Sequence, residues 1–312
     1  MKRKAKRGFG IIGSADDSLV RHLSKTAKTR GLLTECYPFA ELATTASTLR
    51  HPGSADFGGR TLEWDSYLVR RVPGPTILAV PRGVGLSEAL ARRAVIAAAA
   101  LAWLDSLEAN GAALMSSPSR VFAFDTKVTQ HPHLERMGLR LPRTIFSNDP
   151  VAIREFAEAL GGEVVMKSVL GGTPALLVRA KSFARFKRVL PVHMVIQEVI
   201  RGDAIRVTLV ADRIVDAVMI SSDTLDYRMS ANYRLKRPAV VPVTVPKQVA
   251  KECVRAAHSM GQILSGVDIV RTAAGEWVFL EFNPMPIFMW RDTLQKSAPT
   301  ANAIIDWLMT TR

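Results

Sequence analysis

The stretch GVDIVRTAAGEWVFLEFNP, residues 266–284, consists of two apolar runs separated by a polar turn that contains glycine, which is the pattern of paired β-strands. Side chains alternate between the two faces of an extended strand, so Glu281 and Asn283 are expected on one face, with Leu280 and its apolar neighbours on the other. If the two strands pair, Asp268 joins the face of Glu281 and Asn283. The stretch therefore predicts a sheet that carries three oxygen-bearing side chains on one face.

Asp268, Glu281 and Asn283 would supply two carboxylates and one amide oxygen. Such a hard, all-oxygen set suits Mg²⁺, with phosphate oxygens and water completing its octahedron. The alternative is that the two acids only solvate a half-exposed sheet. The rest of the chain favours the metal site, because residues suited to binding a nucleotide precede it.

Two lysines lie earlier in the chain, Lys127 in FDTK and Lys167 in VVMKSVLGGT. Lys167 interrupts an apolar strand, where an unpaired ammonium group is costly, so an anionic partner such as a nucleotide phosphate is expected. Gly171 and Gly172 follow in a turn whose backbone N–H groups could approach phosphates closely. The alternative for the two glycines is a simple reversal of the chain.

The run QEVIRGDAIRVTLV, residues 197–210, is an apolar strand that ends in acidic residues and glycine before a second strand containing Arg206. The backbone at a strand end commonly binds adenine, and a guanidinium group can hold a transferring phosphoryl group by bidentate contact. The alternative is a surface hairpin. The order of these elements along one chain is more informative than any one of them.

From about residue 110 to 310, the order and approximate spacing of these elements resemble the ATP-grasp ligases, in particular their ribosomal-protein-S6-modification-like branch. Within that branch, three runs look like the microviridin-type (graspetide) peptide ligases: LPRTIFSND at 141–149, DYR at 226–228 and GEWVFLEFNP at 275–284. The run YLVRR at 67–71 resembles a segment of their N-terminal lobe more loosely.

The resemblance implies an α/β fold made of α+β lobes, the ATP-grasp fold. Its expected parts are an N-terminal α/β lobe at 1–110, a small central lobe at 111–195, and a C-terminal antiparallel-sheet lobe with the magnesium site at 196–312.

The resemblance also implies ATP and Mg²⁺ as cofactors and a role for each matching residue. In chain order these are Lys127, Lys167, Gly171 and Gly172 at the ATP phosphates, Glu198 and Val199 against the adenine, Arg206 on the acyl phosphate, Arg228 near the substrate, and Asp268, Glu281 and Asn283 around two Mg²⁺ ions.

Two departures from the family pattern are visible. The ribose-binding acid of the family immediately precedes the Ile-Arg pair, whereas this chain has Ala204 there and Asp203 one place earlier. Either Asp203 substitutes for that acid or the ribose contact is lost. After Asn283 the chain continues PMPIFMW in place of the Pro-Asn-Gly-Gln-Trp run common in microviridin-type enzymes, a difference that concerns the peptide substrate more than the ATP chemistry.

Hydrophobic spacing and helix-end residues predict most elements after residue 85. Asp149 and Pro150 are expected as N-cap and first residue of a helix. His131 and His133, which flank a proline, could bind a metal, but a surface loop is the favoured interpretation. The expected helices are 14–30, 86–107, 121–139, 151–160 and 247–264, and the expected strands are 8–13, 163–169, 175–179, 194–200, 205–211, 214–220, 266–271 and 277–282.

Composition limits the class of protein. The chain has 312 residues, of which 48% are hydrophobic, which is enough for a sizeable core. The longest apolar run, 94–104, is too short to cross a bilayer, and the basic N-terminus is not followed by a signal-peptide pattern. Cys36 and Cys253 cannot build a disulfide framework. A cytoplasmic protein with no membrane partner is therefore expected.

The formal net charge of +14 raises the question of an anionic partner. No zinc-finger spacing and no RNA-recognition signature accompany the basic residues, so nucleic acid is an unfavoured partner. An acidic substrate or nucleotide phosphates would also account for the charge. The oligomeric state is left open, with a homodimer as one alternative.

The sequence therefore predicts an ATP-dependent ligase that joins a carboxylate to an amine or hydroxyl through an acyl phosphate. Its expected substrate is a ribosomally made precursor peptide. Two alternatives remain: a ligase for amino acids or other small molecules in natural-product biosynthesis, and a non-catalytic nucleotide-binding module. Retention of Asp268, Glu281 and Asn283 together argues against the module.

Overall fold

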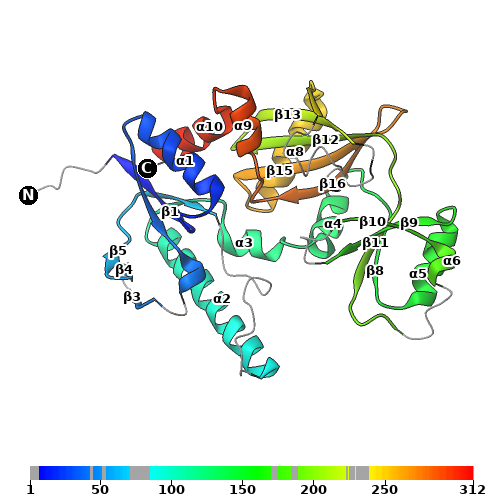
Figure 1. Cartoon of the computed structure of the whole chain (residues 1–312), viewed down its shortest axis with the longest axis horizontal. Helices are drawn as coiled ribbons and strands as arrows, with labels where there is room; N and C mark the ends of the chain where they lie inside the picture. The colour runs from blue at the N-terminus through cyan, green and yellow to red at the C-terminus, as the bar shows by residue number, and fades with distance from the viewer. Residues whose placement is uncertain are drawn as a thin grey trace, which may run out of the picture.

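The computed structural model describes residues 7–42, 45–50, 54–70, 85–169, 174–183, 189–222, 224, 229 and 239–311. Three residues with expected roles, Gly171, Gly172 and Arg228, lie outside this part of the chain. The described residues form four sheets, which are arranged with helices into three lobes (Figure 1).

The N-terminal lobe contains a four-stranded parallel sheet with the strand order β2-β1-β6-β7. Its strands are β1 (Gly8–Ile12), β2 (Leu33–Tyr37), β6 (Ser66–Val69) and β7 (Ala113–Met115). A small antiparallel sheet beside it consists of β3 (Ser47–Arg50), β4 (Ser54–Phe57) and β5 (Arg60–Thr61). Since β7 pairs with β6, the N-terminal sheet extends past residue 110, where we expected the lobe to end.

Two long helices accompany this sheet, α1 (Ser18–Thr29) and α2 (Leu86–Ala109). Asp17 caps α1 by accepting a hydrogen bond from Leu19 N at 2.8 Å. The predicted strand at 8–13, helix at 14–30 and helix at 86–107 are confirmed to within a few residues. One end of α2 extends beyond the sheets and away from the rest of the molecule (Figure 1).

The central lobe is an antiparallel sheet with the order β10-β9-β11-β8. It contains β8 (Thr144–Ser147), α5 (Pro150–Ala159), β9 (Glu163–Ser168), β10 (Leu176–Arg179), α6 (Ala180–Phe183) and β11 (Met194–Gln197). Asp149 accepts a hydrogen bond from Val151 N at 2.9 Å, and Pro150 is the first helical residue, as predicted. The helices cover one face of the sheet, where Ile153, Val164 and Ile196 are fully buried.

The C-terminal lobe is a five-stranded antiparallel sheet with the order β14-β13-β12-β15-β16. Its strands are β12 (Asp203–Val210), β13 (Arg213–Ser221), β14 (Ala239–Pro242), β15 (Leu264–Arg271) and β16 (Trp277–Asn283). Helix α8 (Lys247–Ser259) packs on one face of this sheet through Cys253 and Ala256. This helix is shorter than predicted, because Gly261, at φ +72°, ends the turn and Leu264 already belongs to β15.

The predicted helix at 121–139 is wrong in one respect. The chain forms two helices there, α3 (Pro118–Ala123) and α4 (Lys127–Arg136), because Thr126 is extended and serves as the N-cap of α4. This break places Lys127 at the start of a helix.

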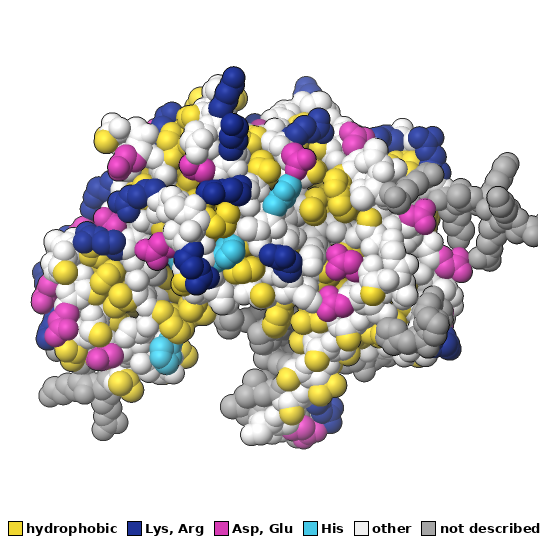
Figure 2. All heavy atoms as spheres, turned by 180° about the vertical axis from the view of Figure 1, so that it is seen from behind, with side chains coloured by type: hydrophobic (Ala, Val, Ile, Leu, Met, Phe, Trp, Pro, Cys, Tyr) yellow, Lys and Arg dark blue, Asp and Glu magenta, His cyan; other side chains and the backbone are white. Residues whose placement is uncertain are grey.

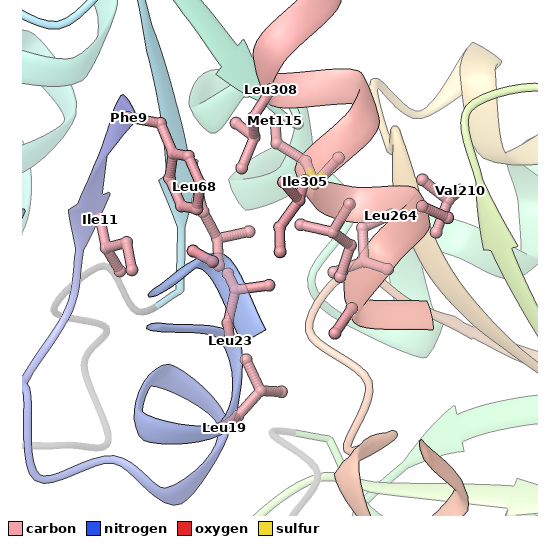
Figure 3. Close-up of a cluster of buried hydrophobic side chains, with 14 of the residues drawn as sticks. Phe9, Ile11, Leu19, Leu23, Leu68, Met115, Val210, Leu264, Ile305 and Leu308 are labelled. Carbon is pink, nitrogen blue, oxygen red and sulfur yellow. The ribbon is translucent and has the colours of Figure 1, made fainter. Parts of the chain in front are cut away.

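Two helices that the sequence analysis did not predict, α9 (Met289–Gln295) and α10 (Pro299–Thr310), complete the fold. Helix α10 brings the C-terminal end of the chain back beside α1 and β1 (Figure 1). Its Ile305 and Leu308 lie between Leu68 of the N-terminal sheet and Leu264 of the C-terminal sheet (Figure 3). The two outer lobes therefore share one hydrophobic core.

No helix in the described ranges has both the length and the hydropathy that a membrane span requires. Both cysteines are free.

Candidate active site

Three charged side chains form a row across neighbouring strands of the C-terminal sheet. Arg206 on β12 is the cross-strand partner of Asp268 on β15, which in turn is the partner of Glu281 on β16. Arg206 Nη2 donates to Asp268 Oδ2 at 2.9 Å, and Nε lies 2.6 Å from Oδ1. The predicted pairing of the two strands is confirmed, and it places the two carboxylates side by side.

A β-bulge interrupts the register next to this row. Asp268 pairs with Glu281 but Ile269 pairs with Phe279, so Leu280 has no cross-strand partner. Phe279 and Phe282 therefore both reach the core, where their rings stack 5.9 Å apart. Leu280 lies outside that core cluster, and our prediction that it shares the face of Phe282 is wrong.

Lys127 completes the row from the side. Its Nζ lies 2.8 Å from Glu281 Oε2, and the lysine side chain is only 8% exposed. Burial opposes ionisation of Glu281, but the positive charges of Lys127, Lys167 and Arg206 hold its pKa below the usual value for a glutamate. Glu281 therefore ionises readily, because three positively charged side chains act on its carboxyl group.

Asn283 lies two residues beyond Glu281 and opposite Gly266 of β15. Its Oδ1 accepts a hydrogen bond from Met285 N at 2.8 Å, which turns the chain at the end of β16. The amide is thus held beside the carboxylate row, two residues along β16 from Glu281.

Helix α4 lies along the outer edge of β16 and satisfies its free backbone groups. Gln130 Nε2 donates to Phe282 O at 2.8 Å, and Gln130 Oε1 accepts from Phe282 N at 3.1 Å. His131 Nε2 lies 3.1 Å from the carbonyl oxygen of Leu280, the residue at the bulge. The edge of the sheet is therefore covered by side chains of a helix.

The buried side chains of α4 are Lys127, Gln130, His131 and Leu134, at the i, i+3, i+4 and i+7 spacing of one helix face. The surface-loop interpretation of His131 is wrong, because the residue lies within α4 and is buried. The helical spacing of these polar residues was the signal in the sequence that could have revealed their burial.

Lys167 on β9 lies on the face of the central sheet opposite to α5 and α6. Its Nζ donates to Gln197 Oε1 at 2.8 Å, and Gln197 is 1% exposed. Gln197 Nε2 donates in turn to Thr144 Oγ1 at 3.1 Å. Its expected contact with a nucleotide phosphate stays a prediction; its described hydrogen bond goes to a buried amide oxygen, and its charge also acts on Glu281. Neither Gln197 nor Thr144 was expected to contribute to the site.

A cavity of about 400 Å³ adjoins Lys127 and His131. Its walls come from α4, from the segment 139–143 and from the face of the central sheet that carries Lys167. Thr144 and Val195 line the cavity from that face. Most of its other lining is apolar, with charged groups at Glu135, Arg140 and Arg143. Its size and mixed lining are typical of a small-ligand pocket.

Glu198 and Val199, expected near adenine, and Asp203, expected near ribose, have different surroundings. Glu198 Oε2 accepts from Arg143 N at 3.1 Å; burial opposes its ionisation, but this hydrogen bond and the Arg143 charge hold its pKa below the usual value. Val199 is half-buried. Asp203 instead pairs with Arg271, with Nη2 2.7 Å from Oδ2. The structure does not bring Asp203 to the charged row.

The oxygen donors fit Mg²⁺ when a phosphate also contributes. Across the described residues there is no group of three or more His, Cys, Asp and Glu side chains able to hold a metal. Asp268 and Glu281 are neighbours, and Asn283 adds an amide oxygen at the end of the same strand. Such a set leaves coordination positions for phosphate oxygens and water, which Mg²⁺ retains in nucleotide sites.

Gly266 is needed for close packing beneath this row. A Cβ added there would lie 2.7 Å from Pro286 Cβ and 2.8 Å from Arg206 Nη1. We expect Gly266→Ala to lower the free energy of unfolding in urea by about 1–3 kcal/mol. Gly85→Ala, where no atom lies within 4 Å of the added Cβ, is the control, and an equal loss in both variants would contradict the packing argument.

The buried imidazole of His131 predicts a pH dependence of stability. Burial lowers the pKa of His131 from 6.5 to about 4, assisted by the charges of Lys127 and Lys167. The folded state therefore binds its proton less readily than the unfolded chain, so the stabilisation is complete above pH 6.5 and is lost as the pH falls towards 4.

We expect the stability difference between the wild type and His131→Leu to shrink by up to about 3 kcal/mol over that range in urea titrations. A difference that stays constant with pH would show that His131 titrates normally.

A family model and the curated relatives each match about half of this chain or more. The model of the RimK-like ATP-grasp domain matches residues 124–308, which is more than half of the chain. Probable alpha-L-glutamate ligase 2 of Shewanella amazonensis is 33% identical over 163 residues, or 49% of this chain and 53% of the relative. A probable alpha-L-glutamate ligase of Nitrosococcus oceani is 29% identical over a stretch of the same length. The chain thus spans about half the length of the curated relatives it matches.

Solved structures match over almost the whole chain. The ATP-grasp ligase PsnB complexed with a minimal precursor has a TM-score of 0.81 at 24% identity, covering 96% of this chain and 98% of PsnB. The macrocyclase MdnC of Microcystis aeruginosa, bound with the precursor peptide MdnA, has a TM-score of 0.77 at 19% identity, covering 97% and 99%. These similarities confirm the ATP-grasp fold that the sequence predicts.

Proposed function

The chain belongs to the RimK-like ATP-grasp family, and on this premise we propose that it activates a substrate carboxylate as an acyl phosphate and joins it to an amine or hydroxyl. ATP-grasp ligases use ATP and Mg²⁺, and one of the similar PsnB structures contains Mg and ADP. We thus propose three things: the acyl-phosphate route, the kind of bond that is formed, and the substrate.

The observation that carries the proposal is the row Arg206, Asp268, Glu281 and Lys127. Each carboxylate is paired with a cation, at 2.6 Å for Asp268 and 2.8 Å for Glu281. The two carboxylates suit Mg²⁺ and the two cations suit phosphate oxygens. Binding of ATP with Mg²⁺ would exchange these internal ion pairs for contacts with the nucleotide and the metal without leaving a buried charge unpaired.

In the first step, an oxygen of the substrate carboxylate attacks the γ-phosphorus of ATP in line, the bond to the β-phosphate oxygen breaks, and ADP leaves. Lys127 and Lys167 hold phosphate oxygens and Arg206 steadies the transferred group, so fixed positive charge meets the charge that spreads over it. Mg²⁺ held by Asp268, Glu281 and Asn283 would neutralise further charge on the phosphates.

In the second step, an amine or hydroxyl attacks the acyl carbon and gives up its proton to the departing phosphate or to water, and phosphate leaves with the electrons of the acyl-oxygen bond. The product is an amide or an ester. No protein nucleophile takes part, so the chain needs only to hold the acyl phosphate until the acceptor arrives.

A ribosomally made precursor peptide is the substrate that we favour. Similarity to PsnB and MdnC, whose structures contain precursor peptides, extends over almost all of the chain. The net charge of +14 suits an acidic peptide, and Figure 2 shows basic side chains spread widely over one face, with acidic ones among them.

A small-molecule ligase is the second candidate. The curated relatives are named alpha-L-glutamate ligases, and they match about half of the chain. Glutamate would then be one of the two reactants, and its amino or carboxyl group would enter the new bond.

Mass spectrometry of reactions with ATP and Mg²⁺ can decide between these candidates. Peptides rich in Asp, Glu, Lys, Ser and Thr should lose one water for each bond formed, with one ADP and one phosphate released per bond. Coupled products from glutamate and amino acids alone would favour the second candidate. Formation of AMP in place of ADP would contradict the acyl-phosphate route.

A further inference from the structure

A chain of side-chain hydrogen bonds links the central lobe to the bulge in β16. It runs from Lys167 Nζ to Gln197 Oε1 at 2.8 Å, from Gln197 Nε2 to Thr144 Oγ1 at 3.1 Å, and from Thr144 Oγ1 to His131 Nδ1 at 3.3 Å. It ends where His131 Nε2 meets Leu280 O at 3.1 Å. These five residues belong to five different elements, β9, β11, β8, α4 and β16.

The chemistry of the two ends fixes the direction of every bond. The ammonium of Lys167 can only donate, so the Gln197 amide must present its oxygen to Lys167 and its NH₂ group to Thr144. The carbonyl of Leu280 can only accept, so His131 carries its proton on Nε2 and offers Nδ1 as an acceptor to Thr144. The Thr144 hydroxyl has one proton and two acceptors, His131 Nδ1 at 3.3 Å and Pro142 O at 2.8 Å, so it donates to both in a three-centre hydrogen bond.

Two members of this chain of hydrogen bonds are buried, so their partners are fixed. Gln197 is 1% exposed and His131 is 6% exposed, so water cannot readily replace a lost partner for either side chain. Lysine has a long, flexible side chain, and the buried amide gives its ammonium one defined position. That position is tied to Leu280, the residue next to Glu281.

The geometry points to His131, Thr144 and Gln197 as positioning residues that hold the Lys167 ammonium in register with the carboxylate row of the C-terminal sheet. This inference rests on the proposed function, in which Lys167 contacts the ATP phosphates. None of the three need touch the reacting atoms. They act by fixing one lobe of the nucleotide site against the other.

The test measures the affinity for ADP with Mg²⁺ by calorimetry, which requires no knowledge of the ligase substrate. Thr144→Val keeps the size of the side chain but removes the hydroxyl that joins Gln197 to His131. We expect it to weaken binding about five- to tenfold, and Thr144→Ser to restore most of the affinity. Thr293→Val, which removes an exposed hydroxyl bonded to Met289 O, is the matched control and should bind normally.

A second comparison separates positioning from general loosening of the fold. In a Lys167→Met background, Thr144→Val should weaken ADP binding no further, because its effect acts through Lys167. Its effect on thermal unfolding should persist in that background. Equal weakening with and without Lys167 would overturn the inference.

The inference and the proposed function fail in different ways. Unchanged ADP affinity in Thr144→Val, with normal binding by the wild type, would overturn the positioning role and leave the ligase function standing. Absence of ADP binding by the folded wild type would overturn both.

Discussion

Glu281→Gln is expected to reduce ATP-dependent product formation by roughly 10³-fold, because it removes the negative charge on which the magnesium site depends. Glutamine is nearly the same size and can still accept a hydrogen bond from Lys127, whose Nζ lies 2.8 Å from the carboxylate in the wild type. The fold should therefore survive the change. ADP release and product mass, measured with a substrate found by mass spectrometry, report the loss.

Glu276→Gln is the matched control for this variant. Glu276 is exposed and lies just before the same strand, so its replacement should leave ADP release unchanged. Circular dichroism of both variants shows whether the fold is intact. Near-normal turnover in folded Glu281→Gln would remove Glu281 from the proposed metal site.

Asp292→Ala is expected to lower the free energy of unfolding by about 3 kcal/mol or more. Asp292 is 1% exposed, and it accepts hydrogen bonds from the backbone N–H groups of Thr300 at 3.0 Å and Ala301 at 2.9 Å. Ala298, the N-cap of α10, offers no side-chain acceptor, so Asp292 of α9 supplies the cap from another helix. His22 of α1 also contacts this carboxylate, at 3.1 Å.

The expected loss is large because α10 packs between the N-terminal and C-terminal sheets (Figure 3). Asp306→Ala serves as the control, since Asp306 lies on the same helix but is exposed and paired only with Arg30 among the described residues. It should cost at most about 1 kcal/mol in urea unfolding. Similar midpoints and slopes for the two variants would contradict the capping role of Asp292.

Local sequence determined much of the fold. Alternation of side chains along 266–284 was sufficient to pair β15 with β16 and to bring Asp268 beside Glu281. Asp149 and Pro150 fixed the start of α5, because capping and the φ angle of proline depend only on nearby residues. The motifs also indicated the family, since their order and spacing lie within the chain itself.

Contacts between distant segments determined the remainder. No local pattern showed the bulge at Leu280, because a bulge is defined by the register of β16 against β15, and the Leu280 carbonyl faces His131 of a distant helix. The pairing of Asp203 with Arg271 likewise depends on the register of β12 against β15.

The sequence by itself therefore determined which residues carry charge and which strands can form, because periodicity and capping are local properties. Only the tertiary structure decided which cation meets which carboxylate, how Lys167 is tied through Gln197 and Thr144 to the edge of β16, and where α10 docks. Such pairings join residues more than a hundred positions apart in some cases, as with Lys127 and Glu281, and depend on burial and geometry that arise only when the lobes pack together.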